Sequence, residues 1–380
     1  MVRRREGSGF RQFPLLFSAL AITAAFAATS ARADSLFVSP SGSDSNQCTV
    51  HAPCATIGYT LSMAPAGSRV TVLPGTYAEM VTITSPVSLI GRDATIDATG
   101  KDRGIVVQGS GAAGTRVQGF TVENATFEGI RVQETSDVVI AGNTVMDNDQ
   151  GAHAETKAGE CQQVGQVPGD CGEGLRLWAA TYSQVLNNDV HDNVGGILVT
   201  DETGPSHDNV ISGNRIRDNA LDCGITLPSH NPNALSDPSA GGVYHNSIIG
   251  NDSEDNGGAG IGTFAPFPGA ASYDNTIANN IVKGNGEGGI NIHSHAPDQN
   301  VSGNVVTHNL VDGNGTDPDS GSPGPNGISL LTIDPQHDRI TGNRFRNEEI
   351  GIWINGPFTL HGMKSNHFAQ SVTTSIDYAP

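Results

Sequence analysis

The feature that most constrains the fold is a short motif that returns along most of the chain. A glycine is followed by Ile or Leu, then by any residue, then by an aliphatic residue. Five of the eight intervals between copies fall between 22 and 29 residues, and longer intervals indicate loop insertions. Only the sixth copy departs, with Thr263 in the last place; the copies begin at Gly104, Gly129, Gly174, Gly196, Gly224, Gly260, Gly289, Gly327 and Gly351.

Asparagine forms a second pattern between these motifs, as pairs separated by five residues. An aliphatic residue precedes each first Asn by three positions, and another follows it by two, except at Ser253. Because Asn tolerates left-handed backbone and can bond to an identical neighbour, we expect these columns to be structural. Asn343 breaks the spacing, with Asn347 four residues on; the regular pairs are Asn143/Asn148, Asn188/Asn193, Asn214/Asn219, Asn251/Asn256, Asn280/Asn285 and Asn304/Asn309.

Each repeat contains three short apolar segments with a local period of two, separated by turn residues. Three strands per turn of 22 to 25 residues predict an all-β fold, a right-handed parallel β-helix of about ten coils, stacked about 4.8 Å apart. Residues 54–66 have helical spacing instead, which predicts a short helix that caps the N-terminal end. We therefore expect a leader over residues 1–33, a cap and first coils over 34–100, and repeats with loop insertions over 101–380.

The leader has the three parts of a secretory signal peptide: a basic start, an apolar stretch over residues 13–28, and Ala31-Arg32-Ala33 as a cleavage site. We predict a secreted or periplasmic protein. No stretch is long and apolar enough for a membrane span. Removal of five Arg and one Glu with the leader takes the net charge from −19 to −23, which argues against a nucleic-acid partner.

Five cysteines would then lie in an oxidising compartment. Cys48–Cys54 and Cys161–Cys171 are close in the sequence, and both pairs are candidate disulfides. This pairing leaves Cys223 over.

Residues 35–100 carry the segments Val38-Ser39-Pro40-Ser41-Gly42, Cys54-Ala55-Thr56-Ile57, Val72-Leu73-Pro74-Gly75-Thr76-Tyr77 and Leu89-Ile90-Gly91. With the repeats that follow, the chain resembles secreted bacterial right-handed β-helix proteins of the pectate-lyase-like superfamily. That superfamily includes pectate lyases, polygalacturonases, alginate lyases and epimerases, and accessory proteins. The Asn-Thr-Asp and Asp-Asp motifs of polygalacturonases and the Asp-Pro-His motif of alginate epimerases are absent. The resemblance therefore implies a fold, and a groove along the glycine-motif strand, more than a reaction.

Alternation along the glycine-motif strand places the two variable positions of each copy outward. In two adjacent copies the sequence repeats almost literally, so Arg131 would stack on Arg176, and Glu128 on Glu173. Arginine suits carboxylates and aromatic rings suit sugars, so Arg131, Arg176 and Trp178 are candidates for binding an anionic sugar. A surface network of Glu and Arg is the alternative.

A second candidate set lies further along the chain. His293 and His295 alternate at a strand end, as metal ligands, a general base or ordinary surface histidines. Asp317-Pro318-Asp319 offers oxygen ligands, so Ca²⁺ is a cofactor that the sequence allows but does not require, and no metal ligand set is assigned. The outward residues Asn291 and Trp353 are candidates for substrate binding.

These observations favour a secreted carbohydrate-binding or carbohydrate-active protein with a polysaccharide partner. A lyase or epimerase would use His293 or Glu173 as base, with Arg131 and Arg176 neutralising a uronate carboxylate. An inverting hydrolase would instead use Glu173 with Asp201 as its two carboxylates. A non-catalytic accessory or adhesin protein is the alternative, and the oligomeric state is left open.

Overall fold

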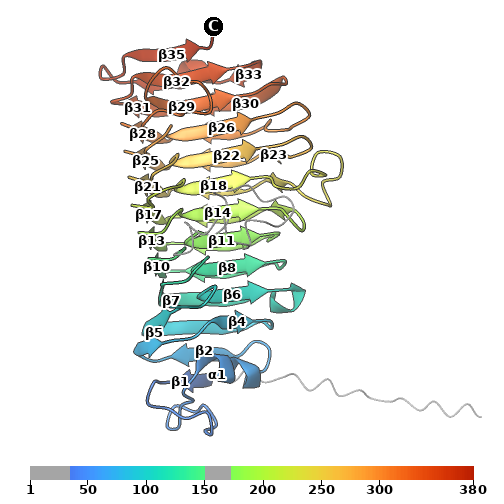
Figure 1. The fold of residues 1–380 in the computed structure, drawn as a ribbon, viewed down its shortest axis with the longest axis vertical. Coiled ribbons are helices and arrows are strands. Elements are labelled where there is room, and N and C mark those ends of the chain that lie inside the picture. Colours follow the sequence, from blue (N-terminus) through green and yellow to red (C-terminus); the bar gives the residue numbers. More distant parts are fainter. Residues whose placement is uncertain (1–34, 150–172) are drawn as a thin grey trace, which may run out of the picture. The chain divides into compact units, whose positions relative to one another are not determined.

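The computed structural model describes residues 35–149 and 173–380, which wind into a stack of parallel coils (Figure 1). Each coil contributes one strand to an 11-stranded sheet, here called the motif sheet because the glycine motif forms its strands. The predicted all-β right-handed parallel β-helix is confirmed, with eleven such strands in the described residues against about ten predicted coils. The motif sheet consists of β4 (Val81–Ile83), β6 (Ile105–Gln108), β8 (Ile130–Gln133), β11 (Leu175–Trp178), β14 (Ile197–Thr200), β18 (Ile225–Pro228), β22 (Ile261–Ala265), β26 (Ile290–Ser294), β29 (Asn326–Leu331), β32 (Ile350–Asn355) and β35 (Thr374–Tyr378).

The other strands of each coil form a 21-stranded sheet, called the large sheet, and a small sheet of three. The large sheet consists of β1 (Ser35–Val38), β2 (Arg69–Val72), β3 (Gly75–Tyr77), β5 (Ser88–Asp97), β7 (Arg116–Glu123), β9 (Val139–Ala141), β10 (Thr144–Met146), β12 (Gln184–Leu186), β13 (Asp189–His191), β16 (Val210–Ser212), β17 (Arg215–Arg217), β20 (Ser247–Ile249), β21 (Asp252–Glu254), β24 (Thr276–Ala278), β25 (Ile281–Lys283), β27 (Val305–Thr307), β28 (Leu310–Asp312), β30 (Gln336–Thr341), β31 (Arg344–Arg346), β33 (Phe358–His361) and β34 (His367–Phe368). The small sheet consists of β15 (Ser206–His207), β19 (Val243–Tyr244) and β23 (Ser272–Tyr273).

The helix expected over residues 54–66 is α1 (Ile57–Met63), at the end of the stack where β1 and β2 lie (Figure 1). The Thr56 side chain caps it by accepting a hydrogen bond from the amide of Tyr59 at 3.3 Å. Among the described residues, the 3-10 helices η1 (Ser110–Ala112) and η4 (Met363–Ser365) lie in turns. Within the described residues, no helix has the length and apolarity that crossing a membrane requires.

The core explains why the motif begins with glycine. The aliphatic residues of the motif are buried and stack directly on their copies, as Leu175 does on Ile130. A Cβ on Gly129 would come within 2.6 Å of the Asn148 amide nitrogen and 2.7 Å of a Val145 methyl group. Contacts this short are not sustainable, so only glycine lets the corner that follows in the chain, at Val145–Asn148, pack against the motif strand.

Buried asparagines form three ladders that run along the stack. In the first ladder each Nδ2 donates to the Oδ1 of the Asn in the next coil, at 2.9 to 3.0 Å. The same Oδ1 also accepts a backbone amide, as the Asn280 oxygen does from Asn251 at 2.8 Å. The predicted structural role of the asparagines is therefore confirmed for Asn143, Asn188, Asn214, Asn251, Asn280, Asn309, Asn343 and Asn366.

One assignment in the predicted columns is wrong. The sequence pattern placed Asn304 in the first column, but Val306 pairs with Ile277, so Asn309 occupies that column and Asn314 the second. Asn304 belongs to a third ladder, with Asn209, Asn246 and Asn275, that was not predicted. The reason is that three successive corners of one coil each carry Asn at five-residue spacing, so spacing alone does not identify the corner.

Two of the ladders end in a buried carboxyl group. Asn304 donates its backbone amide to Oδ1 of Asp338 at 2.8 Å, and Asn314 donates its side-chain amide to Oε1 of Glu348 at 3.0 Å. Burial raises the pKa of Asp338 to about 8 and that of Glu348 to about 7. Both carboxyl groups therefore retain a proton in the folded protein at pH values where the unfolded chain has lost it.

This difference predicts that stability falls as the pH rises. The contribution of Asp338 is fully present below its unfolded pKa of 3.8 and is lost as the pH rises through about 8. Asp338→Asn keeps the acceptor and cannot ionise, so at pH 8.5 it should exceed the wild type in free energy of unfolding by about 2–4 kcal/mol. Urea titrations at pH 5 and pH 8.5 measure this; equal pH dependence of the two proteins would contradict it.

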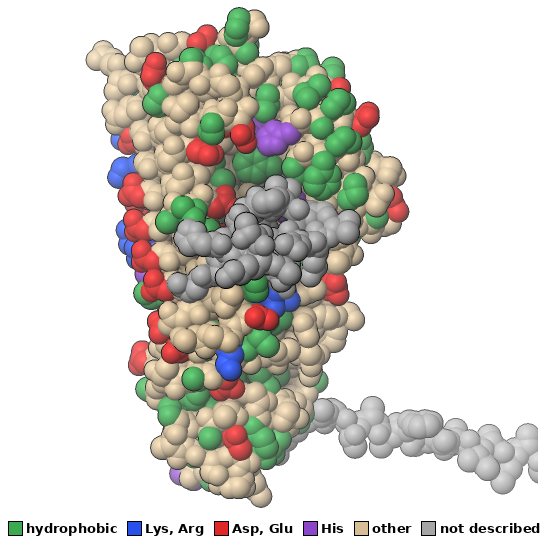
Figure 2. Space-filling view, in the orientation of Figure 1, with side chains coloured by type: hydrophobic (Ala, Val, Ile, Leu, Met, Phe, Trp, Pro, Cys, Tyr) green, Lys and Arg blue, Asp and Glu red, His purple; other side chains and the backbone are tan. Residues whose placement is uncertain are grey.

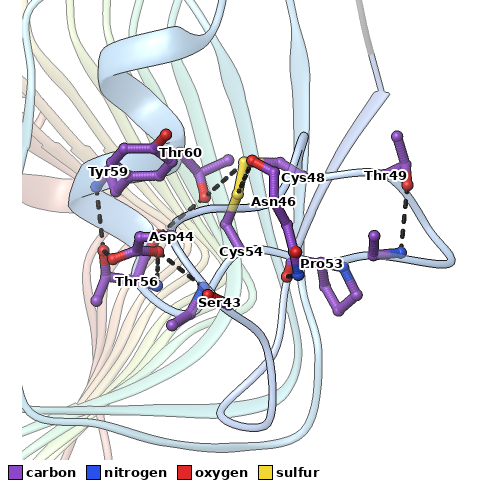
Figure 3. The surroundings of a disulfide bond; sticks show 12 residues. Ser43, Asp44, Asn46, Cys48, Thr49, Pro53, Cys54, Thr56, Tyr59 and Thr60 are labelled. Atoms are coloured by element: carbon purple, nitrogen blue, oxygen red, sulfur yellow. Dashed lines mark hydrogen bonds between the residues drawn. A yellow bond between two sulfur atoms is a disulfide. The ribbon is translucent and has the colours of Figure 1, made fainter.

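The predicted disulfide between Cys48 and Cys54 is present, beside α1 (Figure 3). Asp44 in the same loop accepts hydrogen bonds from the amides of Ala55 and Thr56, at 2.8 and 3.0 Å, so the loop is fixed at both ends. Cys223 is buried. The predicted Cys161–Cys171 pair lies outside the described residues.

Candidate functional site

The outward side chains of the motif sheet form two columns, as alternation predicts. Arg131 pairs in register with Arg176, and Gln133 with Trp178. Further along, Asn291 pairs with Ser329, and Ser329 with Trp353. The candidate residues thus divide into two groups: β11 and β26 are four strands apart, or about 19 Å at the usual strand spacing.

The first group is a buried charge network centred on Arg176, whose side chain is fully buried. Its Nη1 lies 3.5 Å from Oε1 of Glu128, its Nη2 contacts Oε1 of Glu202, and its Nε donates to Thr200 at 3.2 Å. Glu128 also pairs with Arg103 at 2.8 Å. Positive and negative groups thus alternate through the network.

Charge compensation governs the pKa values here. Burial alone would raise the pKa of Glu128, but the guanidinium groups of Arg103, Arg176 and Arg131 outweigh it and hold the pKa below its usual value. Burial likewise opposes ionisation of Glu202, yet Arg176 and His230 lower its pKa to about 2. Burial lowers the pKa of Arg131 to about 10. The carboxylates of Glu128 and Glu202 are therefore ionised and already matched with Arg176.

Trp178 is enclosed by this network. The guanidinium carbons of Arg176 and Arg131 lie 4.4 and 5.3 Å from the centre of its ring, and its Nε1 donates to Thr203 at 3.0 Å. Only 3% of Trp178 is exposed. The ring that the sequence offered as a sugar platform is engaged by cations instead.

Asp201 anchors the loop that follows β18. Its Oδ1 accepts the amides of His230 and Asn231, at 2.5 and 3.1 Å, and its Oδ2 accepts Ser229 Oγ and the Gly242 amide, at 2.7 and 2.5 Å. Burial outweighs these bonds and raises its pKa to about 6. Glu173 is also buried, with its carboxylate against Gly195. Neither carboxylate faces open solvent.

The network predicts a stability effect that separates it from a sugar site. Arg176→Met keeps the aliphatic volume but leaves Glu128 and Glu202 without a buried cation between them. The free energy of unfolding should fall by about 3–5 kcal/mol. Arg217→Met, which removes a partly exposed arginine paired with Asp189 and Asp218, is the matched control and should cost below about 1 kcal/mol. Denaturant titration compares them, and equal costs would contradict a structural role for Arg176.

The second group is a cluster of histidines and carboxylates around His293 on β26. Nε2 of His293 lies 2.8 Å from Oδ2 of Asp317, and its Nδ1 lies 3.4 Å from Nε2 of His295. Nε2 of His295 is 3.9 Å from Oδ2 of Asp319. His293 is fully buried, while 30% of the His295 side chain is exposed, so the three residues Asp317, His293 and His295 form a line from interior to surface.

A hollow of about 340 Å³ opens where this line reaches the surface, bordered by His295, Asp319, Ser294, Leu331 and Ile333. In Figure 2 the upper part of the viewed face shows a histidine beside hydrophobic and acidic side chains. Such a mixture of apolar wall and polar groups is typical of small-ligand sites.

Two carboxyl groups of the cluster have shifted pKa values of opposite sign. Burial would raise the pKa of Asp317, but the polar contacts with His293, Ser329 and Ser320 hold its pKa well below the usual range. Burial raises the pKa of the nearby Glu287 to about 7, and the charges of Asp317 and Asp319 add to this effect. Asp317 is thus a fixed anion, and Glu287 exchanges a proton near neutral pH.

Two buried amides beside the cluster have unused hydrogen-bonding capacity among the described residues. Neither Oδ1 nor Nδ2 of Asn291 has a partner, and Oδ1 of Asn326 has none. Both oxygens converge on Gly288, where a Cβ would come within 2.3 and 2.6 Å of them. Buried polar atoms of this kind usually meet water or a ligand.

Trp353 holds the loop that supplies the carboxylates. Its Nε1 donates to the carbonyl oxygen of Ser320 at 3.1 Å, and the Asn355 amide donates to the same oxygen at 2.8 Å. Trp353 is 4% exposed, so it supports residues 315–326 from beneath.

The nitrogen and oxygen atoms of His293, His295 and Asp319 lie within 4.8 Å of one another and could hold a metal ion. Ca²⁺ prefers six to eight oxygen ligands, which two imidazoles and one carboxylate do not supply. The set suits Zn²⁺ or a similar ion better than Ca²⁺. A Ca²⁺ cofactor stays a prediction from the sequence.

Sequence reasoning identified His293, Asn291 and the Asp317–Asp319 segment but missed that they meet. The alternation in the sequence gave a signal for each half of this cluster. His293 and His295 are separated by one residue, as are Asp317 and Asp319, so each pair can present both side chains on one side. Nothing in the spacing says where an insertion folds back, and Glu287 and Asn326 carried no signal beyond their proximity to glycine motifs.

The fold and these outward columns define a right-handed parallel β-helix protein with a polar site on one sheet. The family model described as right handed beta helix region matches residues 103–240 and 238–332, so the chain belongs to that family. A Bacillus subtilis (strain 168) protein, the uncharacterized YwoF, is 30% identical over 128 residues, which are 33% of this chain and 25% of that protein. This chain therefore matches a quarter of that relative's length.

Two solved structures show the same fold. Pectate lyase Pel9A superposes with a TM-score of 0.53 at 17% identity, over 89% of this chain and 79% of that chain. The Dettilon tailspike protein superposes with a TM-score of 0.51 at 16% identity, over 85% and 64%. At these identities the likeness concerns the fold alone.

Proposed function

We propose that this chain is an exported protein that acts on an acidic polysaccharide, as a lyase or C5 epimerase, at the His293 cluster. The observation that carries the proposal is the line from Asp317 through His293 to His295, which ends in the 340 Å³ hollow. A buried carboxylate behind an imidazole orients the ring and stabilises positive charge on it.

Both reactions begin by removal of the proton beside a uronate carboxylate. His295 borders the hollow and is the proton acceptor, while His293 and Asp317 position it and share the developing charge. Glu287 in its protonated form donates a hydrogen bond to the substrate carboxylate, which lowers the cost of negative charge there. Asn291, a candidate for substrate binding in the sequence, is buried beside the cluster together with Asn326, so its amide would reach a sugar only through a bridging water.

The arginine network has a different role in this proposal from the one the sequence suggested. Arg176 and Arg131 lie four and five strands from His293, about 19 and 24 Å at the usual strand spacing, too far to contact the same sugar ring. In this proposal the arginine network stabilises the motif sheet, and a longer polysaccharide would lie across the outer face of that sheet.

Replacement of the acceptor tests the proposal. His295→Gln should lower kcat by about 10²–10⁴-fold on a responsive uronan, with KM changed little, because the amide cannot take the proton. Asp317→Asn should lower kcat through loss of ring orientation. Lyase activity is measured by absorbance of the unsaturated product, and epimerase activity by deuterium incorporation at C5 from heavy water.

His245→Gln is the matched control, since this histidine is exposed in the turn after β19, outside the motif sheet. Binding is measured separately by calorimetry. Binding without turnover on any uronan would exclude the enzyme and favour the accessory or adhesin alternative. If the protein neither binds nor turns over any uronan, the polysaccharide proposal itself is contradicted.

Glu287 predicts the pH dependence of the reaction. Since its carboxyl group must be protonated to donate, kcat/KM should fall as the pH rises through about 7. Glu287→Gln retains a donor and cannot ionise, so this limb of the profile should disappear. A wild-type profile that stays flat between pH 6 and pH 8 would contradict the role of Glu287.

A further inference from the structure

One column of outward side chains on the large sheet carries charges of alternating sign in five successive coils. The column reads His191, Arg217, Glu254, Lys283, Asp312 and Arg346 in successive coils. Within it, Arg217 pairs with Asp189 and Asp218 at 3.3 and 3.0 Å. Figure 2 shows basic and acidic side chains interspersed along the edge where Figure 1 places these strands. In this column Arg217, Lys283 and Arg346 each have a carboxylate as register neighbour.

Near the C-terminal end, the neighbouring column places an arginine without an acidic register neighbour beside Arg346. The register neighbours of Arg344 are Leu310 and His367, neither of them acidic. Arg346 lies beside Asp312, but Oδ1 of that carboxylate accepts the Asn347 amide at 2.6 Å. Neither Arg344 nor Arg346 makes an ion pair with any described residue, and both are exposed.

A hollow of about 600 Å³ lies beside these two arginines. Its wall includes Arg344, Arg346, His308 and His367, with the hydroxyl groups of Thr341 and Ser365, and no Asp or Glu. On a chain of net charge −19, a hollow lined by four basic side chains is unexpected.

The turn at this hollow departs from the other coils. The corresponding left-handed position is Gly or Asn at Gly142, Asn187, Gly213, Gly250, Asn279 and Gly342, but it is His308 here, with φ of 57°. A Cβ on Gly342 would lie within 3.2 Å of three atoms of the His308 ring. Glycine at this position of the next coil therefore leaves room for the imidazole. A histidine in a position that favours Gly or Asn is a departure from the repeat that the fold does not require.

We infer that this hollow, formed by His308, Arg344, Arg346 and His367, binds a phosphate or sulfate monoester. Guanidinium groups match tetrahedral oxyanions through paired N–H donors. The hollow is larger than one such anion, so the remaining volume accommodates the group that carries the ester, such as a sugar. The site lies on the large sheet and does not depend on the function proposed for the motif sheet.

Calorimetry with the full chain tests this inference, with inorganic phosphate, glucose 6-phosphate and glucose as probes. Glucose 6-phosphate should bind with a Kd below about 1 mM, and glucose should not bind. Arg344→Gln should weaken phosphate-ester binding by about 10-fold, the usual effect of one charge-assisted contact. His308→Asn should weaken it by about 3-fold while the thermal midpoint is kept, because Asn279 occupies the same position one coil earlier.

Arg217→Gln is the matched control: an outward arginine of the same sheet whose loss should leave binding unchanged. If inorganic phosphate binds as tightly as the ester, the oxyanion site stands and its ligand is the free ion. The inference is overturned if neither phosphate probe binds, if glucose binds equally well, or if Arg217→Gln weakens binding as much as Arg344→Gln.

Discussion

The amide–amide hydrogen bond between consecutive coils is the interaction on which the rest of this structure depends. Each ladder asparagine gives one N–H to the oxygen of the next coil and another to a backbone carbonyl, as Asn280 does with Asn309 and Ile248, both at 2.9 Å. A buried amide satisfied in this way fixes the height of its corner relative to the neighbouring coils. The corners therefore stay aligned while loops of very different length leave the stack between them.

Alignment of the corners explains how an irregular loop can build a regular site. Residues 315–326 are an insertion, yet Asp317 reaches His293 at 2.8 Å because Trp353 and Asn355, on a strand further along, hold the Ser320 carbonyl oxygen. The stack supplies the histidine and the support, and the insertion supplies the carboxylate. The arginine network shows another outcome of stacking, in which Arg176 is paired with the buried carboxylates of Glu128 and Glu202.

Much of this architecture could be predicted from the sequence, because the repeat imposes one-to-one register between coils. The outward position of Arg131, the stacking of Arg176 on it, and the Cys48–Cys54 bond follow from alternation and proximity. Burial of those arginines does not follow, since it depends on Glu202 and His230 from other turns. The assignment of Asn304 failed because Asn304, Asn309 and Asn314 lie at three successive corners of one coil with the same five-residue spacing. The spacing alone therefore does not tell which ladder an Asn belongs to.

The position of the proton on the His293 ring tests the account of the site most directly. In ¹⁵N-labelled protein, the account predicts that Nε2 carries the proton, since it faces Asp317, and that the ¹H resonance of this proton is shifted downfield. That shift should be lost in Asp317→Asn. A proton on Nδ1 instead, or a resonance that ignores the substitution, would contradict the proposal that the inserted loop and the stacked strand form one site.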